Sequence, residues 1–300
     1  MFYIKLLRNI ISLCPMNTNS IKLLINYSRS GGTLISRVLS SLPNVVLLSE
    51  VNPNQNSVPY LDVAYQMKQW YNLDVAGNTY LEKIEFIYNW CNNNNKILIV
   101  RDYSAFDFLP NPVNLFSPKG SLENYKLLHS HFPIQTICFV RDAFDVWISR
   151  DCPPQFSNYY CQYVSSILQL NVPIFKYEDF CLNPSVQLKM ICEELNLNYD
   201  EKVLKSYKDN HKITGDNLFD IPSRGIKMGE IKPLKRKRIA VYLQNKINKD
   251  ENMQQLNLML NYPITYKNEY YFYEEKPSKI WVELKFWIRK LTNKYPKHLY

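Results

Sequence analysis

The stretch YSRSGGTLISR, residues 27–37, constrains the fold of this chain more than any other segment. A strand-like run, IKLLINY (21–27), leads into it, and apolar residues at helical spacing (34, 35, 38, 39 and 42) follow it. α/β proteins hold phosphate groups at such glycine-bearing strand–helix turns, because free backbone N–H groups and the helix dipole point at the anion. The pattern therefore predicts an α/β domain with an anion-binding loop.

This loop differs from the ATPase loop, because the signature G-x-x-x-x-G-K-[ST] is absent and no lysine precedes the threonine. Arg29 stands at its front instead and would offer a planar cation to an anion. Gly31 and Gly32 lack a Cβ, so the backbone can approach a ligand closely. On the loop alone, a strand–helix turn without a ligand remains the alternative.

The rest of the chain alternates between strand-like and helical patterns. Strand-like runs lie at 45–48, 96–100, 136–140 and 172–176. Helical patterns lie at 80–91, 144–150, 158–170 and 185–195. This alternation predicts a P-loop-like three-layer α/β fold, with a central parallel sheet flanked by helices and ligands bound at the carboxyl ends of the strands. We expect this domain to span 1–262, to include a long irregular excursion at 106–130, and to be followed by an aromatic, basic extension at 263–300.

Composition narrows the partners and the compartment. The net charge of +9 favours an anionic partner without naming it. The seven cysteines are scattered and form no C-x-x-C pair, so we expect free thiols in a reducing cytoplasm and no zinc site. No apolar run reaches the ~18 residues of a membrane span. Lys5 and Arg8 interrupt the apolar start of the chain, which argues against a signal peptide.

Three further segments carry candidate binding residues. The strand at 136–140 ends at Arg141, and Ser149 follows eight residues later, about two helical turns on, so both side chains can reach one phosphate beside the first loop. The segment FKYEDF (175–180) follows the last strand. The run at 223–238 holds seven basic residues and one acidic residue, which is also compatible with a solvated loop or a nucleic-acid patch.

Over about residues 21–240, these pieces resemble in their order the sulfotransferase superfamily, whose members use 3′-phosphoadenosine 5′-phosphosulfate (PAPS). The family's 5′-phosphosulfate loop, [KR]-S-G-T-T, corresponds to Arg29-Ser30-Gly31-Gly32-Thr33, with Gly32 in place of a threonine. The arginine at the front of the loop makes the chain more similar to the bacterial and tyrosylprotein branches than to the cytosolic phenol type.

The resemblance also implies roles for residues later in the chain. Arg141 and Ser149 match the family's 3′-phosphate motif, and Tyr177 matches the tyrosine that lies against the adenosine. Arg224 and Gly225 are similar to the basic loop that wraps the 3′-phosphate. The implied reaction moves a sulfuryl group from PAPS to a hydroxyl or amine and leaves PAP. It needs no metal, since cationic side chains such as Arg29 carry the charge of the departing phosphate.

Such a transfer requires a base for the acceptor proton, and the sequence offers several candidates. Tyrosylprotein-type members place a glutamate where Glu50 stands, 21 residues after Arg29; a capping or surface role is the alternative. Asp102 ends the strand near 96–100, where an ion pair with Arg101 is the alternative. His129 and His131 are expected in a loop and remain further candidates for the base.

The acceptor itself cannot be read from these motifs. Glycan, lipid headgroup, peptide and small alcohol all stay open, with specificity expected in 52–80 and 103–130 and no nucleic acid expected as a partner. The alternative function is a non-catalytic basic module that binds nucleotide or nucleic acid. The amphipathic run at 278–294 would dock on the domain or lie peripherally on a membrane.

Overall fold

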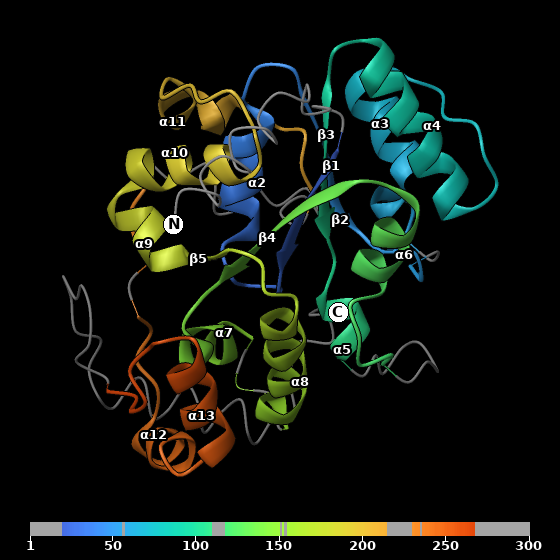
Figure 1. Cartoon of the computed structure of the whole chain (residues 1–300). Coiled ribbons are helices and arrows are strands. Elements are labelled where there is room, and N and C mark those ends of the chain that lie inside the picture. Colours follow the sequence, from blue (N-terminus) through green and yellow to red (C-terminus); the bar gives the residue numbers. More distant parts are fainter. Residues whose placement is uncertain are drawn as a thin grey trace, which may run out of the picture.

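A parallel five-stranded sheet forms the centre of the molecule (Figure 1). The computed structural model describes residues 20–55, 58–109, 118–150, 152, 155–214, 230–234 and 236–267. The strands are β1 (Ile21–Asn26), β2 (Val45–Val51), β3 (Ile97–Asp102), β4 (Ile134–Val140) and β5 (Ile174–Lys176), in the spatial order β2-β3-β1-β4-β5. All five strands predicted from the sequence are confirmed, as is their parallel pairing.

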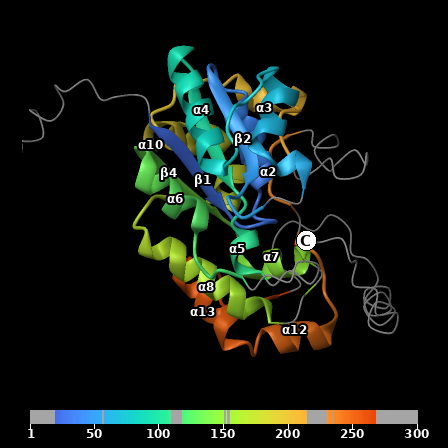
Figure 2. The same cartoon turned by 90° about the vertical axis from the view of Figure 1, so that its right-hand side faces the viewer.

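Helices cover both faces of this sheet, which explains why its strands are apolar on both sides (Figure 2). One face carries α2 (Gly32–Ser40), α9 (Tyr177–Leu182), α10 (Pro184–Glu194) and α11 (Val203–Ser206). The other carries α3 (Val63–Tyr71), α4 (Tyr80–Asn93), α6 (Glu123–His131) and α8 (Phe156–Gln169). The predicted three-layer α/β fold is therefore confirmed.

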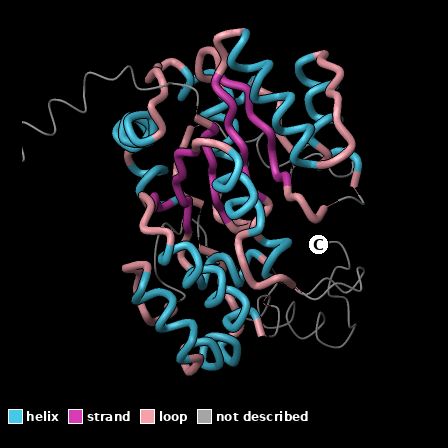
Figure 3. The backbone as a smooth tube through the Cα atoms, turned by 45° about the vertical axis from the view of Figure 1, so that its right-hand side comes forward, coloured by secondary structure: helices cyan, strands magenta, loops and turns pink. Residues whose placement is uncertain are grey.

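A group of helices lies beyond the carboxyl edge of the sheet, at the lower end of the molecule in Figures 1 and 3. This group contains α5 (Ala105–Phe108), α7 (Ala143–Ser149), α12 (Val241–Ile247) and α13 (Glu251–Met259), and α8 packs against α5 and α13. Two short 3₁₀ turns, η1 (Pro59–Leu61) and η2 (Tyr207–Asp209), complete the described elements. Tyr266 is fully buried against Phe144, so the packing of the domain continues past the expected boundary at 262.

One expected loop is partly helical. Residues 106–130 were predicted to be irregular, but α6 occupies Glu123–His131 and places both His129 and His131 on a helix. Leu128 of α6 is buried against the core, and Asp107 accepts a hydrogen bond from the Glu123 backbone N–H at the helix start. Tertiary contacts thus stabilise a helix whose own apolar pattern is too weak to predict it.

The C-terminal run at 278–294 lies outside the described residues. None of the described helices has both the length and the apolar character that a membrane span requires.

Candidate functional site

In the loop between β1 and α2, other groups can approach the backbone closely. Gly31 caps α2 with a φ of 86°, and a Cβ added there would lie 2.3 Å from Cδ2 of Tyr177. Arg29, two residues earlier, has a φ of 72°, a left-handed conformation that non-glycine residues rarely adopt. The ring of Tyr177, predicted from a distant segment, therefore packs directly on the loop.

Arg29, Arg141 and Ser149 meet at this loop, as the sequence predicts. Arg29 Nε donates to both the backbone oxygen and Oγ of Ser149, each at 3.3 Å. Arg141 follows β4, and its NH1 donates to the Arg29 carbonyl oxygen at 3.2 Å. Because β1 and β4 are neighbours, the segments that follow them bring two guanidinium groups to one place.

Tyr177 and Glu178 surround the Arg141 guanidinium. The guanidinium carbon lies 4.9 Å from the centroid of the Tyr177 ring, and Arg141 Nε lies 3.9 Å from Glu178 Oε1. Burial raises the pKa of Glu178 to about 7, although Tyr262 and Arg141 both favour its charged form. Arg141 Nε is buried and has no hydrogen-bond acceptor among the residues that the structure describes, so it offers a donor to an anion.

The late basic run contributes to the structure as well as to surface charge. Arg236 is 3% exposed and lies between Asp142 and Asp145 at the start of α7. Its guanidinium also lies 5.1 Å from the Tyr266 ring centroid. Arg236 is therefore neither a solvated charge nor a nucleic-acid contact, and it fixes the helix that carries Ser149. Arg224 and Gly225 lie outside the described residues.

Glu50 lies at the carboxyl end of β2 and is paired. Its Oε1 accepts from Arg101 NH2 at 2.7 Å, and its Oε2 accepts from Thr214 Oγ1 at 3.3 Å. The Glu50 side chain is 15% exposed, so solvent still reaches it. Glu50 has a φ of 55° and lies at a register shift between Leu48 and Val51.

Asp102 lies on the opposite face of β3 from Arg101, because consecutive strand residues point to opposite faces. The suggested ion pair between the two residues is therefore wrong: Arg101 pairs with Glu50. Asp102 is 1% exposed and accepts a hydrogen bond from Ser104 Oγ, and burial raises its pKa to about 6. The contacts favour Glu50 over Asp102 as the group nearest the anion loop.

The two candidate histidines are exposed on α6. His129 stacks on Tyr125 with ring centroids 5.4 Å apart, and His131 Nδ1 lies 2.8 Å from Ser130 Oγ. These contacts stay within the helix, so neither ring is directed at the anion loop by a described partner.

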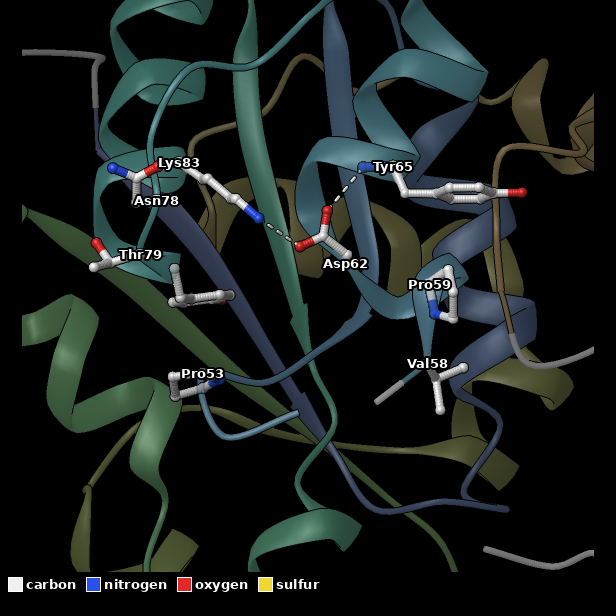
Figure 4. Close-up of a pocket in the computed structure, with 9 residues that line it drawn as sticks. Pro53, Val58, Pro59, Asp62, Tyr65, Asn78, Thr79 and Lys83 are labelled. Atoms are coloured by element: carbon white, nitrogen blue, oxygen red, sulfur yellow. Dashed lines mark hydrogen bonds and ion pairs between the residues drawn. The ribbon is translucent and has the colours of Figure 1, made fainter. Parts of the chain in front are cut away.

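A cavity of about 690 Å³ lies between the segment after β2 and the first turns of α3 and α4 (Figure 4). Its lining combines flat apolar groups with hydrogen-bonding groups: Pro53, Val58, Pro59, Asp62, Tyr65, Asn78, Thr79, Tyr80 and Lys83. Lys83 and Asp62 point toward one another across it and form an ion pair of 2.8 Å. Burial raises the pKa of Tyr60, which follows the lining residue Pro59, and the charge of Glu50 adds to this shift. Gln66 Nε2 donates to the backbone oxygens of both Tyr60 and Ser49, which connects this side of the cavity to the end of β2.

Sequence reasoning missed three residues at this edge. Arg150 NH1 donates to Ser28 Oγ beside the loop. Thr214, 5% exposed, bonds to both Ser49 and Glu50. Arg101 contacts Asn26, Ser49 and Glu50. Arg150 and Arg101 adjoin the predicted residues Ser149 and Asp102 in the sequence, whereas Thr214 had no such signal.

Comparison with known proteins identifies the fold. No family model matches the chain, and no curated protein matches it. The sulfotransferase domain from the curacin biosynthetic pathway superposes with a TM-score of 0.55 at 14% identity, over 81% of this chain and 98% of that domain. The sulfotransferase domain of the Synechococcus PCC 7002 olefin synthase gives a TM-score of 0.51 at 17% identity, over 83% and 98%. The chain thus has the fold of sulfotransferase domains.

Buried carboxyls predict a pH dependence of stability. Burial raises the pKa of Asp107 to about 8, with the charge of Asp102 adding to the effect. In the unfolded chain an aspartate such as Asp107 loses its proton near pH 4. The folded state therefore binds more protons above that pH, and the free energy of unfolding falls as pH rises toward 8. We expect a loss of at least about 1 kcal/mol between pH 5 and 7.5 in urea unfolding.

Asp107→Asn cannot ionise and should make this dependence less steep, with the remaining slope due to Asp102 and Glu178. Asp74→Asn, at an exposed ion pair with Lys68, serves as the control and should leave it unchanged. An equally steep fall in both variants would show that Asp107 is ionised in the folded protein.

Proposed function

We propose that the chain is a PAPS-dependent sulfotransferase that transfers a sulfuryl group to a hydroxyl or amine without a metal. The observation that carries the proposal is the convergence of Arg29, Arg141 and Ser149 on the loop before α2. The loop combines two guanidinium groups, a helix N-terminus and two glycines, and it lies on the fold of sulfotransferase domains. These groups can bind a ligand that carries phosphates at both ends.

The residues of the loop fit such a ligand. A Cβ at Gly31 would strike the ring of Tyr177, so the glycine allows this tyrosine to pack directly on the loop. Within the described part of the chain Arg141 Nε is a buried donor without a hydrogen-bond acceptor, and a 3′-phosphate would satisfy it. Arg29 and the N–H groups of the first turn of α2 would hold the phosphosulfate end, and Ser30 and Thr33 lie in the same segment. Arg224 and Gly225 remain proposed 3′-phosphate contacts from the resemblance alone.

Proton removal from the acceptor is assigned to Glu50. PAPS supplies the activated sulfuryl group; the chain supplies cations for the leaving phosphate and a carboxylate for the proton. Glu50 lies on β2 at the carboxyl edge of the sheet. Only β3 separates β2 from β1, the strand that leads into the anion loop. Its partial exposure lets an acceptor hydroxyl reach it.

The cavity of Figure 4 is the proposed acceptor site. Pro53 follows Glu50 by three residues, a distance of at most about 10 Å along the chain. The lining offers aromatic faces beside a charged pair and polar groups, which suits an acceptor that carries several hydroxyl or amine groups. Its location agrees with the expectation that 52–80 determines the acceptor.

One assay separates this enzyme from a basic binding module. Radiolabelled sulfuryl transfer from PAPS to a pooled cell extract should give a labelled product, and EDTA should not abolish it. A nucleic-acid-binding module would instead bind oligonucleotides better than PAP and lose them steeply with salt. Complete loss of transfer in EDTA that Mg²⁺ restores would overturn the metal-free reaction.

Arg141→Ala tests the 3′-phosphate site. A charge-assisted hydrogen bond contributes roughly 1.5–3 kcal/mol, so the affinity for PAP should fall about 10- to 150-fold. AMP, which lacks the 3′-phosphate, should lose much less affinity. Titration calorimetry with both nucleotides measures the difference, and equal losses would place Arg141 away from that phosphate.

Glu50→Gln tests the base. The substitution keeps the shape of the side chain and removes its basicity, so the transfer rate at saturating PAPS should fall by at least ~100-fold. PAP affinity should stay within a few-fold. Asp102→Asn is the matched control and should affect stability more than rate. A normal rate for Glu50→Gln beside an inactive, folded Asp102→Asn would assign the base to Asp102.

Tyr65→Ala tests the acceptor site. Tyr65 is 43% exposed and lines the cavity, so its removal should raise the KM for the acceptor several-fold and leave PAP affinity unchanged. Tyr199→Ala, at a similarly exposed tyrosine that does not line the cavity, should change neither quantity. Equal acceptor KM values for the Tyr65 variant and the unmodified protein would exclude this cavity.

A further inference from the structure

Arg101 is a buried cation between the proposed base and the anion loop. It is 3% exposed and lies near the end of β3, paired with Leu24 of β1 on one side and with β2 on the other. Its Nε donates to Asn26 Oδ1 at 3.0 Å, and its NH2 donates to Glu50 Oε1 at 2.7 Å. One side chain thus connects three adjacent strands.

The backbone of β2 is shaped around this side chain. Leu48 pairs with Val100 and Val51 pairs with Asp102, so Ser49 and Glu50 both lie opposite Arg101. Two residues opposite one define a β-bulge, and bulges redirect the side chains they contain. Glu50 adopts its left-handed conformation here, with its carboxylate on the Arg101 guanidinium.

The loop side of Arg101 explains an unusual residue. A Cβ at Gly32 would lie 2.5 Å from Arg101 NH2 and 2.2 Å from Asn26 Nδ2. Gly32 occupies the position of a threonine in the pattern that the loop resembles. The guanidinium and the Asn26 amide thus fill the space that a side chain there would need, directly under the first turn of α2.

We propose that Arg101 is a positioning residue that couples the base to the anion loop, an inference that rests on the proposed sulfuryl transfer. It fixes the orientation of the Glu50 carboxylate and balances its charge while the acceptor approaches. The acceptor proton then passes to Glu50. The acceptor oxygen forms its bond to sulfur, and the sulfur–oxygen bond to the 5′-phosphate breaks with its electron pair left on the phosphate.

Protonation of Glu50 changes the electrostatics of the site. The carboxyl becomes neutral, so the positive charge of Arg101 is no longer balanced and acts on the loop where the leaving phosphate gains charge. Proton uptake and anion stabilisation are thereby linked through one guanidinium.

A double-mutant cycle between Arg101 and Glu50 tests this coupling. Arg101→Met should lower the transfer rate from PAPS at least 30-fold, while PAP affinity, measured by calorimetry, stays within about five-fold. In the Glu50→Gln background the same change should cost several-fold less than in the unmodified protein, because Arg101 no longer orients a base there and only its charge on the anion loop is lost.

Arg101→Lys keeps the charge without the two-pronged geometry, so its rate should lie between those of the unmodified protein and Arg101→Met. This variant also keeps the test valid if Arg101→Met does not fold, which circular dichroism would reveal. Additive rate losses in the cycle, or a lysine variant as slow as the methionine variant with PAP affinity lost in parallel, would overturn the coupling.

The cycle also separates this inference from the function on which it rests. Absence of any sulfuryl transfer by the unmodified protein would refute the enzyme itself. Normal transfer by Glu50→Gln would refute the base, and the coupling with it. A slow Glu50→Gln enzyme with an additive Arg101 effect would refute the coupling alone.

Discussion

The ion pair between Arg101 and Glu50 organises the carboxyl edge of the sheet. Arg101 contacts side chains of β1 and β2 from its own place on β3, and it lies against the first turn of α2. Removing one partner of a buried pair leaves an uncompensated charge, which typically costs about 3–5 kcal/mol. The β2 bulge and the position of Thr214 therefore depend on this contact, whereas the anion loop is also held by Ser149 and Arg141.

Two candidate site residues also have strained backbone conformations. Arg29 and Glu50 both have positive φ angles, and such conformations cost about 1–3 kcal/mol each at non-glycine residues. Both are held by contacts that reach far in sequence, Arg29 by Ser149 and Glu50 by Arg101. These tertiary contacts offset the conformational free-energy cost at Arg29 and Glu50. They hold a cation and a carboxylate at the carboxyl edge of the sheet.

Sequence reasoning recovered the sheet because its strands are continuous apolar runs, as parallel strands buried on both faces require. It did not predict the side-chain pairings that depend on tertiary contacts. Residue order suggested that Arg101 pairs with Asp102, whereas strand geometry sends these side chains to opposite faces. The bulge that brings Glu50 to Arg101 has no periodic sequence pattern by which it could be predicted. Arg236 lies in a basic run, and nothing in that run indicates that it is buried in ion pairs with two aspartates.

Gly32 shows how a departure from a motif can be explained by a residue outside it. Considered alone, glycine in place of threonine removes a hydroxyl from the loop. The structure places the Arg101 guanidinium and the Asn26 amide against that position, so a threonine there would collide with a buried cation. The glycine and the arginine, 69 residues apart, are therefore one structural feature. A side chain at position 32 would have to displace the Arg101 guanidinium and the Asn26 amide from the hydrogen bonds that hold them at Glu50 and at each other.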